Sequence, residues 1–242
     1  MGDTAACGCT KTISVRSDGE LLDLIVKEVR SALRERRPGG TPRAATAPGM
    51  YPRIPLGVSN RHIHLTEPTF HRLFGAGATF EQMRPLYQPG EFASAHTLTI
   101  VGPKLRSIPG VRILGPIRKY DQVEVSLTDA IFLGIDPPVA NSGTLDRAAP
   151  LTLAGPAGSV YLERCAIVAS RHIHMTPADA LSLGVRDGDY CRVRIGGEKS
   201  TIFEQVLIRT NDNWRLQIHL DTDDANAANV RDDTDVEFLG KM

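Results

Sequence analysis

The sequence of 242 residues has no excess of either charge sign, few aromatic residues and few cysteines. Lys plus Arg and Asp plus Glu both number 28, and this balance argues against a nucleic-acid binder, which normally carries a basic excess. Aromatic residues make up only 5 % of the chain, so the core should be aliphatic. Four cysteines in a chain of this size do not form a disulfide scaffold, and we expect reduced thiols in a cytosolic protein.

Long apolar runs and several common catalytic motifs are also missing. No segment approaches the roughly 18–20 apolar residues of a membrane span, and the first fifteen residues hold no secretory signal. Glycine-rich phosphate loops and a Gly-x-Ser-x-Gly elbow are absent. Cys165 and Cys191 fall in apolar, strand-like runs, where a structural role is expected. We therefore expect no membrane partner and no protein nucleophile.

The N-terminal region, residues 1–53, differs in character from the rest. Ser17 and Glu20 fit a capping box, and apolar residues then recur at spacings of three and four up to Leu33, which predicts an amphipathic helix over 17–35. A segment rich in Pro, Gly, Ala and Thr follows and reads as a flexible linker. The helix either folds back onto the body or inserts its apolar face into a groove of a partner.

An internal repeat is the strongest feature of the body. VSNRHIHLTEPTFHRLFG aligns with VASRHIHMTPADALSLGV at an offset of 110 residues (168 − 58). Each copy predicts a strand followed by a Thr N-cap and a helix.

Short strands separated by Gly and Pro fill the remaining body. They are predicted at 96–102, 111–115, 122–127, 150–155, 190–197, 201–209 and 216–221. This spacing predicts a mainly β fold with short helices, arranged as two small barrels or sandwiches. The repeat divides the body into two domains, which we expect over 54–145 and 146–242, with exchange of strands between them permitted.

Two His-x-His pairs lie at equivalent positions of the repeat. Residues i and i+2 of a strand face the same side, so His62 projects beside His64, and His172 beside His174. Paired imidazoles suit zinc better than a core, although structural or exposed histidines are the alternative. A third ligand would come from His71, His96 or His219, or from a carboxylate such as Glu124, which on its pattern alone is equally well an outward-facing strand residue.

A basic stretch lies between residues 104 and 119. Its members are Lys104, Arg106, Arg112, Arg118 and Lys119, with no acidic residue between the first and the last. Arginine matches phosphate oxygens in a bidentate fork, so the stretch indicates anion binding. The alternative is a solvated basic face.

Four separated segments together resemble the phosphate propanoyltransferase (phosphotransacylase) family of bacterial microcompartments. They are VSNRHIHLT, PIRKYDQVEVSLTDA, SRHIHMTPADA and IHLDTDDANAA, in the family's order. The resemblance implies two tandem barrels and the reversible conversion of a short-chain acyl-CoA (propanoyl-CoA or acetyl-CoA) plus phosphate into acyl phosphate plus CoA. Two zinc ions per chain and direct attack of phosphate on the thioester are also implied.

The resemblance assigns roles to individual positions. His62, His64 and Glu124 would hold one zinc, and His172, His174 and His219 the other. Arg118 would be the catalytic, phosphate-binding arginine. The CoA-contacting positions would be Val58, Ser59, Asn60, Lys104, Arg112 and Asn226, with Arg106 as a substitute for Lys104 because the spacing from Lys104 to Arg112 is one residue longer than is usual in the family.

The resemblance also implies a location and partners. Residues 17–35 would act as an encapsulation peptide that binds shell or core enzymes of a microcompartment in the bacterial cytoplasm, and we expect a homo-oligomer. Two rival functions use the same residues: a zinc-dependent acyl-CoA thioesterase, and a non-catalytic assembly module stabilised by zinc. Structural zinc sites normally have four protein ligands, whereas only three can be named for each site here.

Overall fold

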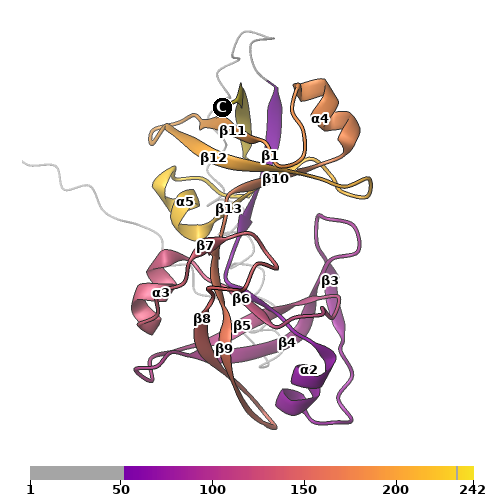
Figure 1. The fold of residues 1–242 in the computed structure, drawn as a ribbon, viewed down its shortest axis with the longest axis vertical. Helices are drawn as coiled ribbons and strands as arrows, with labels where there is room; N and C mark the ends of the chain where they lie inside the picture. Colours follow the sequence, from indigo (N-terminus) through magenta and orange to yellow (C-terminus); the bar gives the residue numbers. More distant parts are fainter. Residues whose placement is uncertain (1–51, 233) are drawn as a thin grey trace, which may run out of the picture. The chain divides into compact units, whose positions relative to one another are not determined.

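A computed structural model describes residues 52–232 and 234–242 of the chain (Figure 1). The predicted helix over 17–35 and the linker after it lie outside the described residues. The described part is mainly β, with short helices between the strands, which confirms the predicted fold class. Element labels follow Figure 1.

Six strands close the first barrel. They follow one another around the ring as β4 (Phe92–Val101), β5 (Ser107–Gly115), β2 (His62–His64), β6 (Gln122–Glu124), β9 (Gly158–Ala169) and β8 (Ala149–Gly155), which returns to β4. Two further strands, β3 (Gln82–Pro85) and β7 (Val139–Ala140), add to β4 and β9. The helices α2 (Glu67–Phe74) and α3 (Leu127–Leu133) follow β2 and β6.

Six other strands close the second barrel. Their order is β1 (Arg53–Ser59), β13 (Gln217–Asp221), β10 (His172–Met175), β12 (Thr201–Thr210), β11 (Tyr190–Ile195) and β14 (Asp235–Lys241). The helices α4 (Pro177–Leu183) and α5 (Thr222–Ala227) follow β10 and β13.

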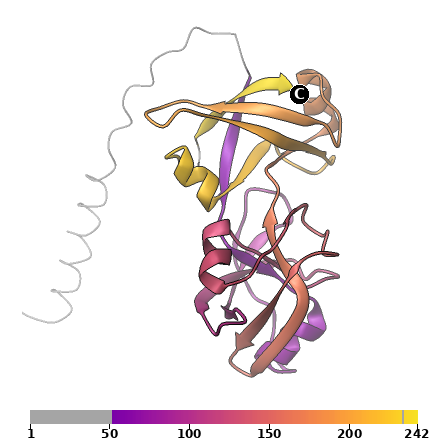
Figure 2. The same ribbon diagram turned by 60° about the vertical axis from the view of Figure 1, so that its left-hand side comes forward.

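Each repeat sends its first strand into the other barrel. β1 precedes β2 in the chain but pairs with β13 and β14 of the second barrel, and it appears in indigo among orange and yellow strands in Figure 2. In the same way β9 precedes β10 but pairs with β6 of the first barrel. A boundary at residues 145 and 146 therefore does not separate the barrels, because 53–59 lie in the second and 149–169 in the first.

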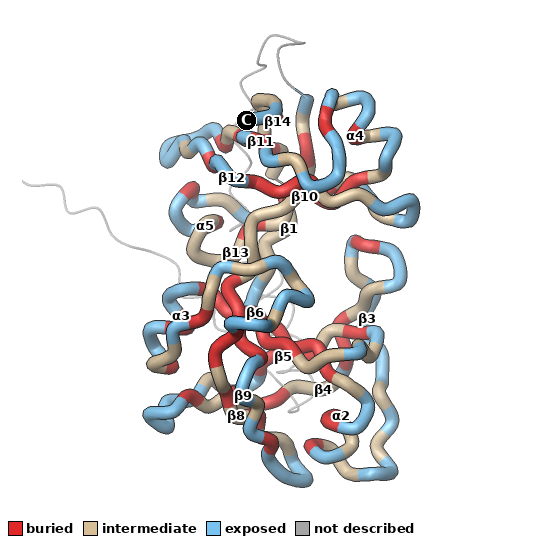
Figure 3. Tube along the Cα trace, in the orientation of Figure 1, coloured by how far each residue is buried: buried red, intermediate tan, exposed pale blue. Residues whose placement is uncertain are grey.

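The hydrophobic cores follow this exchange. One core packs Ile63 against Leu151 and Cys165 of the exchanged β8 and β9, and the other packs Ile54 and Leu56 of β1 against second-barrel strands. Figure 3 shows buried stretches running along the strands of both barrels. Strand alternation explains the histidines: Ile63 and Ile173 occupy the two cores, so the flanking histidines project from the opposite face.

Threonine caps end both histidine strands, as the repeat predicts. The hydroxyl oxygens of Thr66 and Thr176 accept hydrogen bonds from the backbone N–H groups of Thr69 and Asp179, at 3.4 and 3.1 Å. These bonds satisfy donors that the first helical turn leaves free. No helix in residues 52–232 and 234–242 is long and apolar enough to cross a membrane.

Candidate active site

Strand register completes two three-residue clusters at equivalent places of the repeat. β2 runs antiparallel to β6 with His62 opposite Glu124, and β10 runs antiparallel to β13 with His172 opposite His219. We call His62, His64 and Glu124 the first cluster, and His172, His174 and His219 the second cluster. In each, one nitrogen or oxygen atom per residue lies within 4.8 Å of the others.

Hydrogen bonds fix the orientation of the first cluster. The Nδ1–H group of His62 donates to the carbonyl of Asn60 at 2.8 Å, which leaves Nε2 facing the Oε2 atom of Glu124 at 3.5 Å. The other carboxylate oxygen, Oε1, accepts a hydrogen bond from Nε2 of Gln122 at 2.7 Å. All three cluster residues are buried.

The second cluster repeats this arrangement with a histidine in place of the glutamate. Nδ1–H of His172 donates to the carbonyl of Ser170 at 2.8 Å, and Nε2 of His219 contacts Oε1 of Gln217 at 3.0 Å. The rings of His172 and His219 stack with centroids 4.9 Å apart. The indole of Trp214 covers His174, with ring centroids 4.1 Å apart.

Burial keeps most of these imidazoles neutral near pH 7. It is the main cause that lowers the pKa of His64 to about 3, and repulsion from His62 adds to it. Burial likewise lowers the pKa of His174 to about 2 and of His219 to about 3, and it lowers the pKa of His172. A neutral imidazole offers a nitrogen lone pair, which is what a metal ion requires.

The carboxylate of Glu124 connects the two clusters electrostatically. Burial alone would raise the pKa of Glu124. The imidazoles of His62, His64 and His172 outweigh burial and hold the pKa of this carboxyl below its ordinary value. A histidine of the second cluster therefore acts electrostatically on the carboxylate of the first.

Unsatisfied nitrogen atoms indicate that both clusters fit a metal ion. Nδ1 of His64 and both ring nitrogens of His174 are buried and have no hydrogen-bond partner among the described residues. A buried polar atom without a partner is costly, and coordination to a metal removes that cost. Imidazole nitrogen and carboxylate oxygen are ligands that Zn²⁺ takes at about 2.0–2.2 Å.

Arg118 lies beside the first cluster. Its positive charge contributes to the lowered pKa of His64. Nη2 of its guanidinium donates to Oε1 of Glu91 at 2.8 Å, whereas Nε is buried and has no hydrogen-bond partner among residues 52–232 and 234–242. One edge of this guanidinium is therefore held in place, while another N–H remains for an anion.

Two of the residues with a predicted role in CoA binding lie beside the first cluster. Ser59 and Glu124 line the same small cavity, and Arg112 lies opposite His62 in the parallel pairing of β2 with β5. The guanidinium of Arg112 donates to the backbone carbonyls of Ser94 and Ala95, at 3.1 and 3.0 Å.

The remaining predicted CoA contacts divide between two places. Val58 is on β1 and Asn60 follows that strand, while Asn226 is on α5, where its carbonyl accepts a hydrogen bond from Lys199 at 3.2 Å. Lys104 and Arg106 instead belong to the loop before β5, and Arg106 donates to the carbonyl of Phe132 in α3. That loop lies at the opposite end of β5 from Arg112, so the structure does not bring Lys104 or Arg106 into the clusters.

Sequence reasoning missed the glutamines behind each cluster. Gln122 and Gln217 lie opposite His64 and His174, and both are buried. The signal was present as a second repeat, because QVEVSLTDA aligns with QIHLDTDDA at an offset of 95 residues (217 − 122). The same offset relates Asp129 to Asp224. These two carboxylates accept hydrogen bonds from the arginines that precede each His-x-His pair, Arg61 and Arg171, at 2.7 Å in both repeats.

Comparison with known proteins identifies the family. Residues 55–231 match the family model described as phosphate propanoyltransferase. A phosphate propanoyltransferase of Lachnoclostridium phytofermentans is 46 % identical over 209 residues, which cover 86 % of this chain and 93 % of that protein. One of Salmonella typhimurium is 43 % identical over 212 residues, with 87 % and 92 % coverage, and one of Thermotoga maritima is 47 % identical over 178 residues, with 73 % and 84 % coverage. The chain therefore belongs to the phosphate propanoyltransferase family and is an acyltransferase.

Proposed function

We propose that this acyltransferase interconverts a short-chain acyl-CoA plus phosphate with acyl phosphate plus free CoA, at the two clusters and Arg118. Propanoyl-CoA and acetyl-CoA are the proposed acyl donors. The observation that carries the proposal is a guanidinium with a free buried N–H beside two groups of metal-ligating side chains. This arrangement supports phosphate binding beside the groups that would activate the thioester.

The first and second clusters would each hold one zinc ion. Their fit rests on neutral imidazoles, on one carboxylate and on buried nitrogens without partners. A zinc ion at the first cluster supplies a Lewis acid that makes the sulfur of CoA a better leaving group. The backbone carbonyls of Asn60 and Ser170 fix the ring orientation of His62 and His172, which preorganises the ligands.

Arg118 would bind phosphate and orient it for attack. A phosphate oxygen forms a bond to the carbonyl carbon of the thioester, the carbon–sulfur bond breaks, and the CoA thiolate leaves. The guanidinium offsets negative charge as the tetrahedral intermediate forms. Glu91 holds Nη2 of Arg118, so the guanidinium is oriented before substrate arrives.

CoA would extend from the clusters along Val58, Ser59 and Asn60. Arg112 and Asn226 are proposed as further contacts, and Lys104 or Arg106 would contact a part of CoA that lies away from the thioester.

Direct attack by phosphate is favoured over a covalent acyl-enzyme. Cys165 and Cys191 are buried, and burial raises the pKa of each thiol to about 12. A thiol with such a pKa is protonated at neutral pH and is a poor nucleophile. Neither cysteine belongs to the clusters.

Phosphate dependence tests the proposed reaction. With propanoyl-CoA or acetyl-CoA, release of CoA should require phosphate and should yield acyl phosphate in equal amount. Release of CoA and free carboxylic acid without phosphate would contradict the proposal and would indicate a zinc-dependent thioesterase.

We also propose that residues 17–35 direct the enzyme into a bacterial microcompartment, as a segment separate from the duplicated body, and that the enzyme is a homo-oligomer. The proposal is supported by the amphipathic pattern and by the linker that follows it. Deleting residues 1–40 should preserve acyl transfer and abolish co-purification with shells. Co-purification of the truncated enzyme would contradict this role.

A further inference from the structure

We propose that Gln88 is a positioning residue that acts from the first barrel to orient His219 of the second cluster. Gln88 lies in the loop 86–91 between β3 and β4. Exposed residues surround it on both sides in the sequence, yet its own exposed fraction is only 2 %. In Figure 3 this loop, above β3, is largely exposed and contains a buried stretch. A buried carboxamide in an exposed loop requires partners, and these partners belong to the other barrel.

The carboxamide of Gln88 binds the segment that leads into β13. Its Oε1 accepts a hydrogen bond from the backbone N–H of Arg215 at 3.0 Å, and its Nε2 donates to the backbone carbonyl of Arg215 at 3.0 Å. Nε2 also donates to Oε1 of Gln217 at 3.4 Å. The side chain therefore fixes both the backbone before the strand and the side chain of Gln217.

Gln217, held by Gln88, in turn fixes the orientation of the His219 ring. Its Oε1 receives Nε2–H of Gln88 and faces Nε2 of His219 at 3.0 Å. A carboxamide oxygen only accepts hydrogen bonds and can accept two. The Nε2 atom of His219 must therefore be the donor and carry the proton. The lone pair on Nδ1 is then left for the second cluster.

Gly57 provides the space for this arrangement. It lies opposite His219 in the pairing of β1 with β13. A Cβ atom at Gly57 would lie 2.6 Å from Nε2 of Gln217, which is closer than real Cβ contacts come. The position of Gln217 is thus bounded by Gly57 on one side and Gln88 on the other.

The equivalent glutamine of the first barrel is held differently. Oε1 of Gln122 accepts the backbone N–H of Gly143 at 2.7 Å, and its Nε2 donates to Ser142 at 2.8 Å. Both partners come from the segment that precedes β8, so the first cluster is supported from within its own barrel. The second cluster instead depends on a loop of the first barrel.

The loop 86–91 also contacts Arg118, the proposed phosphate-binding residue. Glu91 in this loop pairs with Arg118 at 2.8 Å. Its backbone N–H donates to the carbonyl of Gln88, so the two positioning contacts share one short turn. The loop consequently ties Arg118 beside the first cluster to His219 in the second cluster.

Zinc titration of the metal-free chain tests the role of Gln88. The inference rests on the proposed zinc sites, so the wild-type chain must first bind two equivalents of added Zn²⁺ in competition with a chromophoric chelator. Gln88→Met is nearly isosteric and removes all three hydrogen bonds. The substitution should lower the affinity for one of the two Zn²⁺ equivalents about tenfold and leave the affinity for the other unchanged. Tenfold is the lower end of the range found when a residue that supports a metal ligand is replaced.

A double-mutant cycle distinguishes positioning from general destabilisation. Gln88→Met should have no further effect on zinc affinity in a Gln217→Ala background, because both changes act through the same hydrogen bond to His219. Met83→Ala is the matched control, since Met83 is an exposed residue of the adjoining strand β3 and should leave both affinities at the wild-type value.

The outcomes separate failure of the inference from failure of the proposed function. The role of Gln88 would be overturned if Gln88→Met bound both zinc ions with wild-type affinity. It would also be overturned if the effects of Gln88→Met and Gln217→Ala on zinc affinity were additive. A wild-type chain that binds no zinc would instead overturn the proposed metal sites. Should Gln88→Met not fold, Gly57→Ala displaces Gln217 from the other side and should weaken the same single equivalent, whereas unchanged zinc binding would contradict the inference.

Discussion

The two histidine clusters share a backbone and differ in chemistry. In both barrels a His-x-His strand lies antiparallel to a strand that supplies the third residue, with a buried glutamine two positions before it. The first barrel supplies Glu124 at this place and the second supplies His219. A divalent ion held by the first cluster would therefore carry less net positive charge than one held by the second. Duplication preserved the geometry, and one side chain changed the electrostatics.

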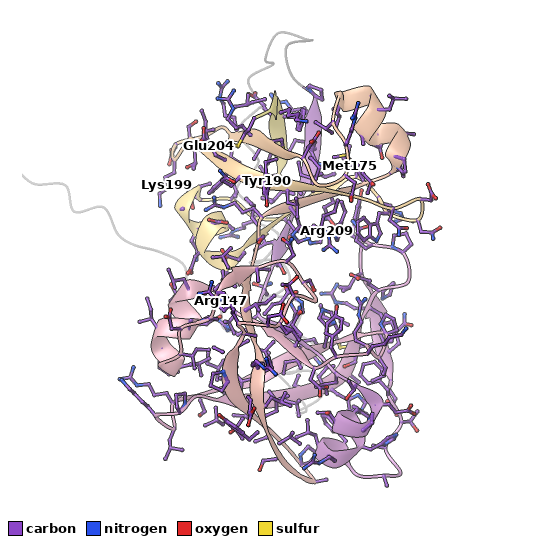
Figure 4. All side chains as sticks on the ribbon, viewed as in Figure 1. Arg147, Met175, Tyr190, Lys199, Glu204 and Arg209 are labelled. Carbon is purple, nitrogen blue, oxygen red and sulfur yellow. The ribbon has the colours of Figure 1, made fainter. Side chains whose placement is uncertain are left out.

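The surroundings of the clusters differ in the same sense. Beside the first cluster, Arg118 keeps a buried N–H without a partner. Beside the second, the guanidinium of Arg209 (Figure 4) lies over the ring of Trp214, with its central carbon 5.3 Å from the ring centroid. The first cluster thus has an arginine ready for an anion, whereas the arginine near the second is engaged with an aromatic face. Under the proposed function, phosphate would therefore bind from the side of the first barrel.

Removing each arginine in turn tests this asymmetry and has the largest expected effect. Arg118→Ala should lower kcat/KM for phosphate by about 10²–10³, because the charge that stabilises the transition state is lost. Arg209→Ala should lower it less than tenfold. Steady-state kinetics with varied phosphate measures both, and elemental analysis should find the same metal content in both variants. Equal losses of kcat/KM in the two variants would contradict the binding of phosphate from the side of the first barrel.

Replacing each buried glutamine should affect only the cluster beside it. Gln122→Ala removes the hydrogen bond to Glu124, and Gln217→Ala removes the contact with His219. Each change should weaken one zinc equivalent about 10–100-fold, the range typical of residues behind metal ligands. Zinc titration of the two variants measures this effect. If either variant loses both equivalents, the clusters are not independent units of the duplication.

The metal-free protein should lose stability in acid. The pKa values of His64, His174 and His219 are lowered to about 3, 2 and 3, so the unfolded chain binds protons below pH 6.5 that the folded chain does not. Stability is therefore fully present above pH 6.5 and falls as the pH drops toward 3.

Thermal unfolding of the chelator-treated chain between pH 7 and pH 4 measures this dependence. Because the pKa of His172 is lowered as well, the second cluster holds three of the four histidines with a lowered pKa, so His174→Gln should flatten the pH dependence and leave the rest to His64, His172 and His219. A melting temperature that does not change across the window would contradict the buried, neutral state of the imidazoles.

Local sequence patterns determined the histidine strands and their caps. The alternation in RHIH places an apolar residue in the core and two imidazoles on the other face, and Thr66 and Thr176 terminate the strands as N-caps. These features depend on neighbours two to four residues apart, which a single sequence displays directly. The seven strands predicted from short apolar runs are all present. β3, β7 and β14 were not predicted, although Val236 and Phe238 of β14 alternate into the second core.

The partners across the barrels were decided only by the tertiary structure. The repeat is visible in the sequence, but the exchange of β1 and β9 is not. Strand pairing depends on backbone register between distant residues, 162 positions apart for Leu56 and Ile218 (218 − 56) and 43 positions apart for Val123 and Ala166 (166 − 123). Gln88 illustrates the same limit. In sequence it is an ordinary polar residue of a turn, and its burial arises only because the loop of one barrel reaches the backbone of Arg215 in the other. The sequence by itself displayed the candidate ligands for a metal ion and for phosphate. Only the folded pairing of strands decided which of them meet, since hydrogen-bond registry and burial are properties of distant segments brought together.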